Sequence, residues 1–237
     1  MVNYLAIDAS TEACSAALMF NGQLYQQFEL CPQSHSLVLL PMVDKLLTQA
    51  GCQLTDLDGL VFGQGPGSFT GVRIGIGVAQ GLAFAADLPV VGVSTLQAMA
   101  QVAYQQHQQT EVIAAIDARM SEVYLGYFRL DANGIMAPIV EEAVLPPEQV
   151  RHYLTERDLL ADDTKPYGVG TGWDAYQEKL AGLTVNQTSP EVLYPHAEAM
   201  LTIAEADFDN GNAVSAELAQ PVYVRDTVSW KKLPGRE

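Results

Sequence analysis

Tyr4-Leu5-Ala6-Ile7-Asp8-Ala9-Ser10-Thr11 opens with a short apolar run that ends at an aspartate and a small polar turn. Its central tetrapeptide, Ala6-Ile7-Asp8-Ala9, occurs again as Ala115-Ile116-Asp117-Ala118, also at the end of an apolar run. Each copy is followed by a second apolar stretch that ends in phenylalanine, Phe20 and Phe128 respectively. The repeat therefore favours duplication of one β-β-β-α unit within the chain.

Strand and helix signals alternate around the first copy. Strands are predicted over residues 4–7, 14–20 and 24–30, with the turn Asn21-Gly22 between the last two. A helix is predicted between Ser34 and Gly51, a strand over 60–62, a helix to about Ala86, a strand over 90–93 and a helix begun by Ser94. This order predicts an α/β fold in which a mixed sheet is flanked by helices.

A polar tract, Gln105–Thr110, has no apolar period and separates two regions. We place a domain boundary there, between a lobe of residues 1–105 and a more polar region of residues 106–237. The second region is predicted to contain a strand over 112–116, a glycine-rich turn over 168–172, a helix over about 196–210 and a strand-like tail around 222–224.

Composition limits the classes of function. The 237 residues include 28 acidic and 12 basic side chains, and the net charge is −16. This charge argues against a chain that grips nucleic acid by itself, because neutralising phosphates drives such binding. Hydrophobic residues make up 49% of the chain, which suffices for a folded core.

The cysteines and histidines show no known site spacing. Three cysteines, without a Cys-x-x-Cys pair, argue against a disulfide framework and favour a reducing cytoplasm. Four histidines without a His-x-x-x-His pair lead us to predict no metal site. No segment reaches the roughly 18 continuous apolar residues that span a bilayer, so we expect a soluble cytoplasmic protein without a membrane partner.

The glycine-rich stretch over residues 63–71 lies between a predicted strand and a predicted helix. Such a loop can hold phosphate with backbone N–H groups at a helix N-terminus. It lacks the Gly-Lys-Ser/Thr ending of a P-loop and the glycine spacing of the dinucleotide fingerprint. A tight strand–helix turn explains the glycines equally well. Its candidate anion contacts are Gly65, Gly67, Ser68 and Gly71.

Asp8, Ser10 and Thr11 form a second candidate phosphate contact. A carboxylate at a strand end, followed by hydroxyls, can hold a phosphate-bound cation through water. A buried carboxylate that accepts backbone N–H bonds is the structural alternative. The recurrence of the aspartate at Asp117 suits a phosphate site between two lobes, although Arg119 stands where the first copy has Ser10.

Two predicted helices are unusually apolar, one from about His35 to Gln49 and one from about Val72 to Ala86. Burial against the sheet is the favoured interpretation of each helix alone. Two such helices on one domain are also suited to pairing with another protein, and the small face of Ala79 and Ala83 allows close approach.

Three segments resemble the TsaB (YeaZ) family. They are the opening Leu5–Thr11, the run Gly63–Gly81 with Pro66-Gly67-Ser68-Phe69-Thr70-Gly71-Val72-Arg73 at its centre, and the ending Ala219–Asp226. The resemblance covers essentially the whole chain. It implies the actin-like ATPase (ASKHA, sugar-kinase-like) fold in two lobes, the second one reduced.

The resemblance also implies a function. Family members take part in forming N6-threonylcarbamoyladenosine beside the anticodon of tRNAs that read ANN codons. They pair with a catalytic paralogue, TsaD, and a P-loop ATPase, TsaE, supports the cycle. We therefore expect a scaffold subunit that meets tRNA only indirectly and forms a homodimer when alone. We expect no tightly bound cofactor, with ATP or ADP and Mg²⁺ at a shared interface left open.

Departures from the paralogue predict a chain without catalytic residues. The paralogue carries a His-x-x-x-His metal motif where this chain has Thr95 and Met99, and neither suits that metal. The family pairs through the two apolar helices, which gives the candidate interface Leu39, Val43, Leu46, Val72, Ile76, Ala79 and Ala83. A stand-alone ATPase or small-molecule kinase is the alternative function, and a peptidase ranks below it.

Overall fold

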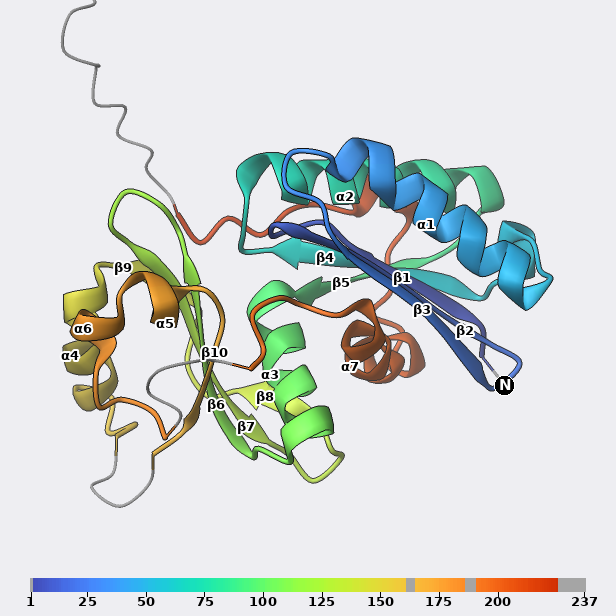
Figure 1. Ribbon diagram of the computed structural model, residues 1–237. Helices are drawn as coiled ribbons and strands as arrows, with labels where there is room; N and C mark the ends of the chain where they lie inside the picture. The colour runs from blue at the N-terminus through green and yellow to red at the C-terminus, as the bar shows by residue number, and fades with distance from the viewer. Residues whose placement is uncertain (1, 161–164, 186–190, 226–237) are drawn as a thin grey trace, which may run out of the picture.

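Two mixed β-sheets and their helices form the molecule (Figure 1). The computed structural model describes residues 2–160, 165–185 and 191–225. The α/β fold predicted from the order of elements is confirmed, and so are the two lobes that the resemblance implied.

The first sheet has the strand order β3-β2-β1-β4-β5. At its centre, β1 pairs antiparallel with β2 on one side and parallel with β4 on the other. The strands match the predicted ones within a few residues, and their bounds are β1 (Tyr4–Asp8), β2 (Ala13–Phe20), β3 (Gln23–Leu30), β4 (Gly59–Gly65) and β5 (Val90–Ser94).

The second sheet repeats this pattern at its own centre. Its order is β10-β6-β7-β8, and β9 also pairs with β7. Here β6 pairs antiparallel with β7 and parallel with β10, as β1 does with β2 and β4. The strands are β6 (Glu111–Asp117), β7 (Val123–Leu130), β8 (Met136–Pro138), β9 (Ala143–Leu145) and β10 (Tyr167–Val169). The two copies of the tetrapeptide thus end topologically equivalent strands.

Helices cover both faces of the first sheet (Figure 1). On one face lie α1 (His35–Ala50) and α2 (Phe69–Ala86), and on the other lies α7 (Ala197–Asp209), next to α3 (Thr95–His107). The second sheet carries α4 (Val150–Thr155), α5 (Gly172–Ala175) and α6 (Gln177–Leu180). Three short 3₁₀ turns complete the described elements, η1 (Leu54–Asp56), η2 (Pro147–Gln149) and η3 (Ala216–Leu218).

Helix boundaries follow local chemistry. Gly51 ends α1 with φ of 66°, a left-handed conformation that glycine adopts without steric cost. The Ser94 hydroxyl accepts a hydrogen bond from the Gln97 N–H at 3.2 Å, which confirms Ser94 as the N-cap of α3. Ser34 precedes α1 as predicted, but its side chain makes no capping bond.

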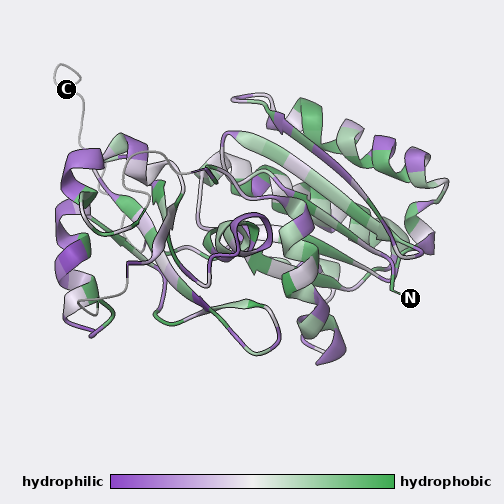
Figure 2. Cartoon of the chain, turned by 60° about the horizontal axis from the view of Figure 1, so that its bottom comes forward, coloured by the Kyte–Doolittle hydropathy of each residue, from purple (hydrophilic) through white to green (hydrophobic). Residues whose placement is uncertain are grey.

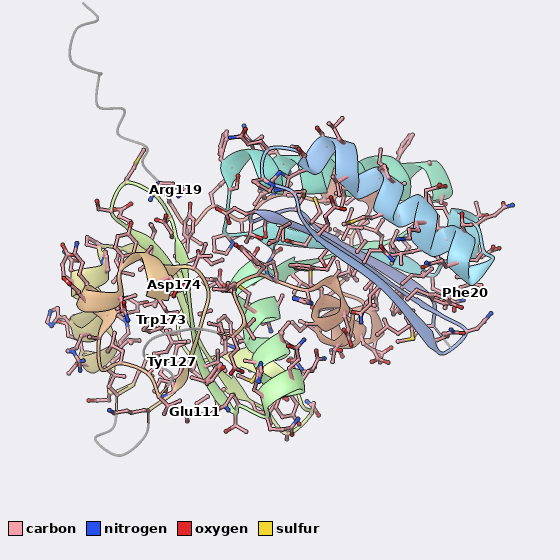
Figure 3. All side chains as sticks on the ribbon, in the orientation of Figure 1. Phe20, Glu111, Arg119, Tyr127, Trp173 and Asp174 are labelled. Atoms are coloured by element: carbon pink, nitrogen blue, oxygen red, sulfur yellow. The ribbon has the colours of Figure 1, made fainter. Side chains whose placement is uncertain are left out.

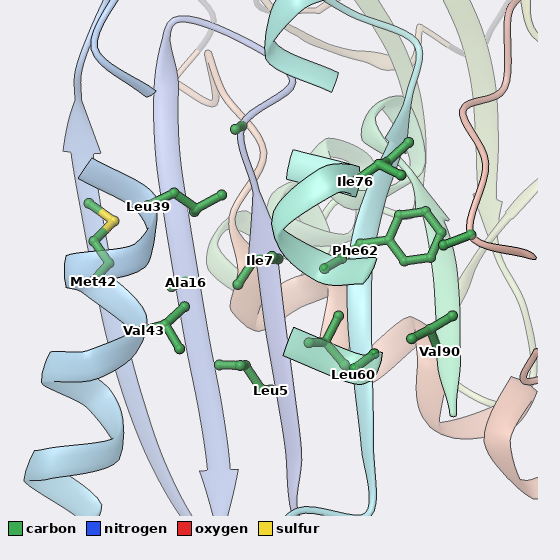
Figure 4. Close-up of a cluster of buried hydrophobic side chains, with 14 of the residues drawn as sticks. Leu5, Ile7, Ala16, Leu39, Met42, Val43, Leu60, Phe62, Ile76 and Val90 are labelled. Carbon is green, nitrogen blue, oxygen red and sulfur yellow. The ribbon is translucent and has the colours of Figure 1, made fainter. Parts of the chain in front are cut away.

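Apolar side chains of α1 and α2 point into the first sheet. Figure 4 shows Leu39 and Val43 facing Leu5 and Ile7, while Ile76 lies over Phe62. Figure 2 colours the chain by hydropathy. Apolar segments gather in the strands, and the outer helix of the second lobe is more hydrophilic.

One element of the second half belongs with the first sheet. Helix α7 packs against β1, β2 and β5, and Met200 and Ala204 lie in one cluster with Ala6 and Val61. The boundary near residue 105 stays a prediction.

The prediction of a strand-like tail around residues 222–224 was wrong. Residues 221–225 form no strand. Val222 instead donates one backbone hydrogen bond to the carbonyl of Gln64 at 2.9 Å, so this part of the chain lies against the start of the glycine-rich loop.

Candidate functional site

Asp8 is buried at the end of β1, with 1% of its surface exposed. Its Oδ1 accepts hydrogen bonds from the Ser10 N–H at 3.1 Å and the Ser10 hydroxyl at 3.0 Å. The Thr95 hydroxyl donates in turn to Ser10 Oγ at 3.0 Å, which links β1 to the start of α3. Burial raises the pKa of Asp8 from 3.8 to about 6, although the two Ser10 bonds oppose this change.

The second oxygen of Asp8, Oδ2, is buried without a hydrogen-bond partner. It faces Gly63 on β4, where a Cβ atom would lie 1.8 Å from it. The same Cβ would lie 3.4 Å from the Met200 methyl group, so α7 closes this space from the other side. Glycine at position 63 is therefore what lets the carboxylate fit between β4 and α7.

The glycine-rich loop packs directly on the turn after Asp8. A Cβ at Gly67 would lie 2.2 Å from the Ser10 carbonyl oxygen, and one at Gly71 would lie 2.2 Å from that of Ala9. The Ser68 N–H donates to the Ser10 carbonyl at 2.7 Å. Close backbone packing therefore explains the glycines at 67 and 71. That these residues contact phosphate stays a prediction.

The structure brings most of the predicted phosphate residues together, but one lies apart. Asp8, Ser10, Thr11, Gly67, Ser68 and Gly71 belong to the packed turn and loop just described. Gly65, with φ of 97°, faces the tail instead, because its Cβ position lies 3.3 Å from the Val222 carbonyl oxygen. Ser68 caps α2 by accepting a bond from the Gly71 N–H at 3.3 Å.

Asp117, at the end of β6, has a different environment. Its Oδ1 accepts from the Arg119 N–H at 2.9 Å and the Tyr176 hydroxyl at 3.0 Å, and its Oδ2 pairs with Arg119 Nη1 at 3.0 Å. Arg119 Nη2 reaches Glu12 in the first lobe at 3.2 Å, an ion pair across the two lobes. Figure 3 places Arg119 at the end of the second lobe that faces the first.

A cleft of about 530 Å³ lies beside the start of α3. Its lining includes Gln64, Ser94 and Gln97 on one side and Glu141 and Glu142 on the other. Glu142 accepts a hydrogen bond from the Ser94 hydroxyl, and burial raises its pKa from 4.5 to about 7. Sequence reasoning missed Glu142, because it lies in a loop without a motif and only the fold brings it to Ser94.

The side chains predicted for the partner interface face inward. All seven are at most 5% exposed and pack against the first sheet, namely Leu39, Val43, Leu46, Val72, Ile76, Ala79 and Ala83. The apolar period that singled them out marks the face that covers the sheet, because burial in the core creates that period. In the structure, other side chains of the same two helices are exposed.

The outward faces of α1 and α2 are also apolar. Leu37 and Leu40 on α1 are 75% and 48% exposed, and Phe84 on α2 is 80% exposed. Gly77 and Gly81 lie one turn apart on α2, and a Cβ at either would meet nothing within 4 Å. We call this surface, made by Leu37, Leu40, Gly77, Gly81 and Phe84, the outer helix face.

Among the described residues, α2 is the one helix long and apolar enough to cross a membrane, judged by length and composition alone. Its mean hydropathy is 1.3, and only 33% of the helix is buried in the structure. Core helices pass the same test, so the finding is weak evidence for a span. The finding shows that α2 is strongly apolar although only a third of its residues are buried.

The chain's own tail covers one flank of α2. Gln80 donates to the Ala219 carbonyl at 3.0 Å, and Arg73 donates to the Tyr223 hydroxyl at 3.0 Å. The guanidinium of Arg73 also stacks 3.6 Å from the ring centre of Phe69. The described part of the tail, up to residue 225, therefore contacts α2 at Arg73 and Gln80.

Thr95 and Met99 are both fully buried. The Thr95 hydroxyl is engaged with Ser10, and Met99 packs in the apolar cluster between α3 and the second sheet. Neither side chain faces the cleft.

Comparison with known proteins agrees with this architecture. Residues 28–227 match the family model described as TsaD, tRNA N6-adenosine threonylcarbamoyltransferase. The chain is 51% identical to the tRNA threonylcarbamoyladenosine biosynthesis protein TsaB of Escherichia coli K12, over 98% of this chain and 99% of that one. It is 44% identical to the protein of the same name from Haemophilus influenzae, over 98% of each chain.

Solved structures give the same result. YeaZ from Pseudomonas aeruginosa superposes with a TM-score of 0.85 and 46% identity, covering 94% of this chain and all of that one. A second Pseudomonas aeruginosa structure, described as an uncharacterized protein with similarity to peptidase YEAZ, has a TM-score of 0.86, 45% identity and coverage of 95% and 100%. Both likenesses extend over both lobes.

Proposed function

The chain belongs to the TsaB family of tRNA threonylcarbamoyladenosine biosynthesis proteins, and on that premise we propose that it acts as a non-catalytic scaffold subunit. Its partner is a catalytic paralogue of the TsaD type, which it docks and holds in an active form. A TsaE-type P-loop ATPase supports the cycle, and the same docking surface pairs two copies of this chain when the paralogue is absent. A function in tRNA modification supports a cytoplasmic location for the complex.

The observation that carries the proposal is the outer helix face. Its large apolar side chains are 48% to 80% exposed, so they do not contribute to the core of the first sheet. Gly77 and Gly81 add a shallow strip where another helix can approach closely. Large apolar side chains exposed on two neighbouring helices of a chain with a net charge of −16 are typical of a protein–protein interface.

Two further observations support a non-catalytic role. Thr95 and Met99, where the resemblance places the paralogue's metal ligands, are buried, and Thr95 bonds to Ser10 while Met99 packs in the apolar core. The acidic charge supports a division of labour in which a partner supplies the basic surface for tRNA.

Reconstitution tests the function. Substrate tRNA, threonine, bicarbonate, ATP and the partner enzymes are incubated with and without this chain, and threonylcarbamoyladenosine is measured by nucleoside mass spectrometry. We expect product only when both this chain and the paralogue are present. Product formed equally well without this chain would contradict the proposal. Tight binding of ATP·Mg²⁺ by the isolated chain, lost in Asp8→Ala, would favour the kinase alternative instead.

Charge substitution tests the docking surface. Leu37→Glu combined with Phe84→Glu places two charges on the outer helix face, and we expect at least a hundredfold weaker binding of the paralogue, because an apolar interface cannot solvate them. Val185→Glu is the matched control, since this side chain is 56% exposed but lies in the second lobe. Calorimetry gives the affinity and circular dichroism the fold. Undiminished affinity in the folded double variant would refute the assigned surface.

A further inference from the structure

Two cysteines and a histidine meet in the core of the first lobe. Cys14 lies on β2, Cys31 directly follows β3, and His35 is the first residue of α1. One ligand atom of each lies within 4.8 Å of the others, and all three residues are buried. The spacing of these residues in the sequence did not predict the group, because it is the pairing of β2 with β3 that brings Cys14 near Cys31.

The donor set is one that zinc prefers. Two thiols and one imidazole are soft to borderline ligands, which suit Zn²⁺ and do not suit Mg²⁺ or Ca²⁺. Zinc holds two sulfur ligands about 3.8 Å apart at Zn–S bonds of about 2.3 Å. The ligand atoms now lie within 4.8 Å of one another, so shifts of about 1 Å bring the two sulfur atoms to the spacing that one Zn²⁺ requires.

One ring nitrogen of His35 makes a hydrogen bond, which leaves the other ring nitrogen as the candidate metal ligand. Its Nε2 lies 2.6 Å from the Thr11 carbonyl oxygen, and because a carbonyl only accepts, Nε2 carries the proton. The lone pair is then on Nδ1, the other ring nitrogen. Histidines that bind metals typically donate their second N–H to a carbonyl or carboxylate in this way.

The strand register argues against a disulfide between the two cysteines. Cys14 stands opposite Glu29, whereas the Cys31 N–H bonds to the Glu12 carbonyl, so the cysteines are diagonal neighbours. Such neighbours have Cα atoms about 7–8 Å apart, and a disulfide beyond about 7 Å requires backbone movement. A bridging ion spans that distance without moving the strands.

We propose that Cys14, Cys31 and His35 form a zinc site, with a water molecule as the fourth ligand. Binding replaces the two thiol protons, which pass to solvent, by one Zn²⁺ held through two thiolates and Nδ1. The residues that directly follow Cys31, Pro32 and Gln33, are exposed, so the group lies close to the surface of the lobe. The ion would tie the β2–β3 hairpin to the first turn of α1. This inference does not depend on the proposed function.

Metal binding by the full-length chain tests the site. The protein is reduced with a phosphine, freed of metal with a chelator, dialysed against Zn²⁺ and assayed for zinc per chain by plasma mass spectrometry. We expect about one equivalent in the wild type, none in Cys14→Ser/Cys31→Ser, and affinity reduced at least about tenfold in His35→Gln. Cys52→Ser is the matched control and should keep its zinc, since Cys52 lies outside the group.

Cobalt keeps the test valid if the double variant fails to fold. Co²⁺ added to the wild type should give thiolate charge-transfer and tetrahedral ligand-field bands, and an equal amount of Zn²⁺ should abolish them. Wild-type protein that binds neither ion above the level of the folded His35→Gln variant would overturn the proposal. So would air oxidation to an intramolecular Cys14–Cys31 disulfide that Zn²⁺ does not prevent.

Discussion

Asp8 and Asp117 end equivalent strands with the same tetrapeptide, yet they have opposite environments. Each follows a strand that is paired antiparallel on one side and parallel on the other. Asp8 is 1% exposed and keeps one oxygen without a partner, whereas the Asp117 side chain is 19% exposed and is paired with Arg119. The difference begins two residues later, with Ser10 in one copy and Arg119 in the other.

The comparison teaches that a repeated motif fixes where a carboxylate lies but not its chemistry. In the first lobe, Gly63, Met200 and Thr95 close around the turn and exclude water. In the second lobe, the turn carries its own cation and stays at the surface.

The largest expected effect is a pH dependence of the folding stability that comes from Asp8. Because the folded pKa of Asp8 is about 6 and its usual value is 3.8, the folded state binds the proton more tightly than the unfolded state. The free energy of unfolding should therefore fall by about 3 kcal/mol as pH rises from about 4 to 6, with this contribution lost above pH 6.

Denaturant unfolding of the wild type and of Asp8→Asn between pH 4 and 8 measures this slope. Asp8→Asn should flatten the slope between pH 4 and 6. Glu142→Gln should remove a further part that extends to about pH 7, because burial raises the pKa of this carboxyl to about 7. An unchanged slope in Asp8→Asn would contradict the sealed environment described for Asp8.

A smaller effect is expected from Gly63→Ala, which places a Cβ against the unpartnered oxygen of Asp8. The new atom would lie 1.8 Å from that oxygen, so the carboxylate or β4 must move, at a loss of about 2 kcal/mol. Gly77→Ala is the control, because its Cβ meets nothing within 4 Å and should stabilise α2 by a few tenths to about 1 kcal/mol. Thermal unfolding distinguishes the two, and a neutral Gly63→Ala would mean that the space around Asp8 is loose.

The smallest effect is expected from Arg119→Ala in the second lobe. Arg119 is 75% exposed and pairs with Asp117 and Glu12, and exposed ion pairs contribute less than about 1 kcal/mol. The loss should shrink further in 0.5 M salt, because screening weakens surface pairs. Arg157→Ala, a cation stacked on Tyr153 at 3.8 Å, is the control. A loss of stability as large as that of Gly63→Ala would contradict this expectation and would mean that the Arg119–Glu12 ion pair contributes strongly to holding the two lobes together.

Most of the fold could be predicted from the sequence, because its elements carry local signals. The strand ends, Gly51 after α1 and Ser94 before α3 were all predicted from residue types whose backbone preferences act locally. The apolar period of α1 and α2 also marked their buried faces. The seven residues that it suggested for docking are buried in the structure, because a periodic signal records the core and not the surface that a partner would cover.

The element order, the repeated strand unit and the acidic charge can be derived from the sequence alone, and three of its segments carry the resemblance to the family. The first three follow from local backbone preferences, from an internal repeat and from composition, none of which needs a distant contact. The three-dimensional structure was needed to show that Asp8 is sealed by Gly63 and α7, that Ser94 meets Glu142, and that Cys14, Cys31 and His35 share one space. Such sites depend on register and on packing between segments far apart in the chain, and no window of sequence encodes them.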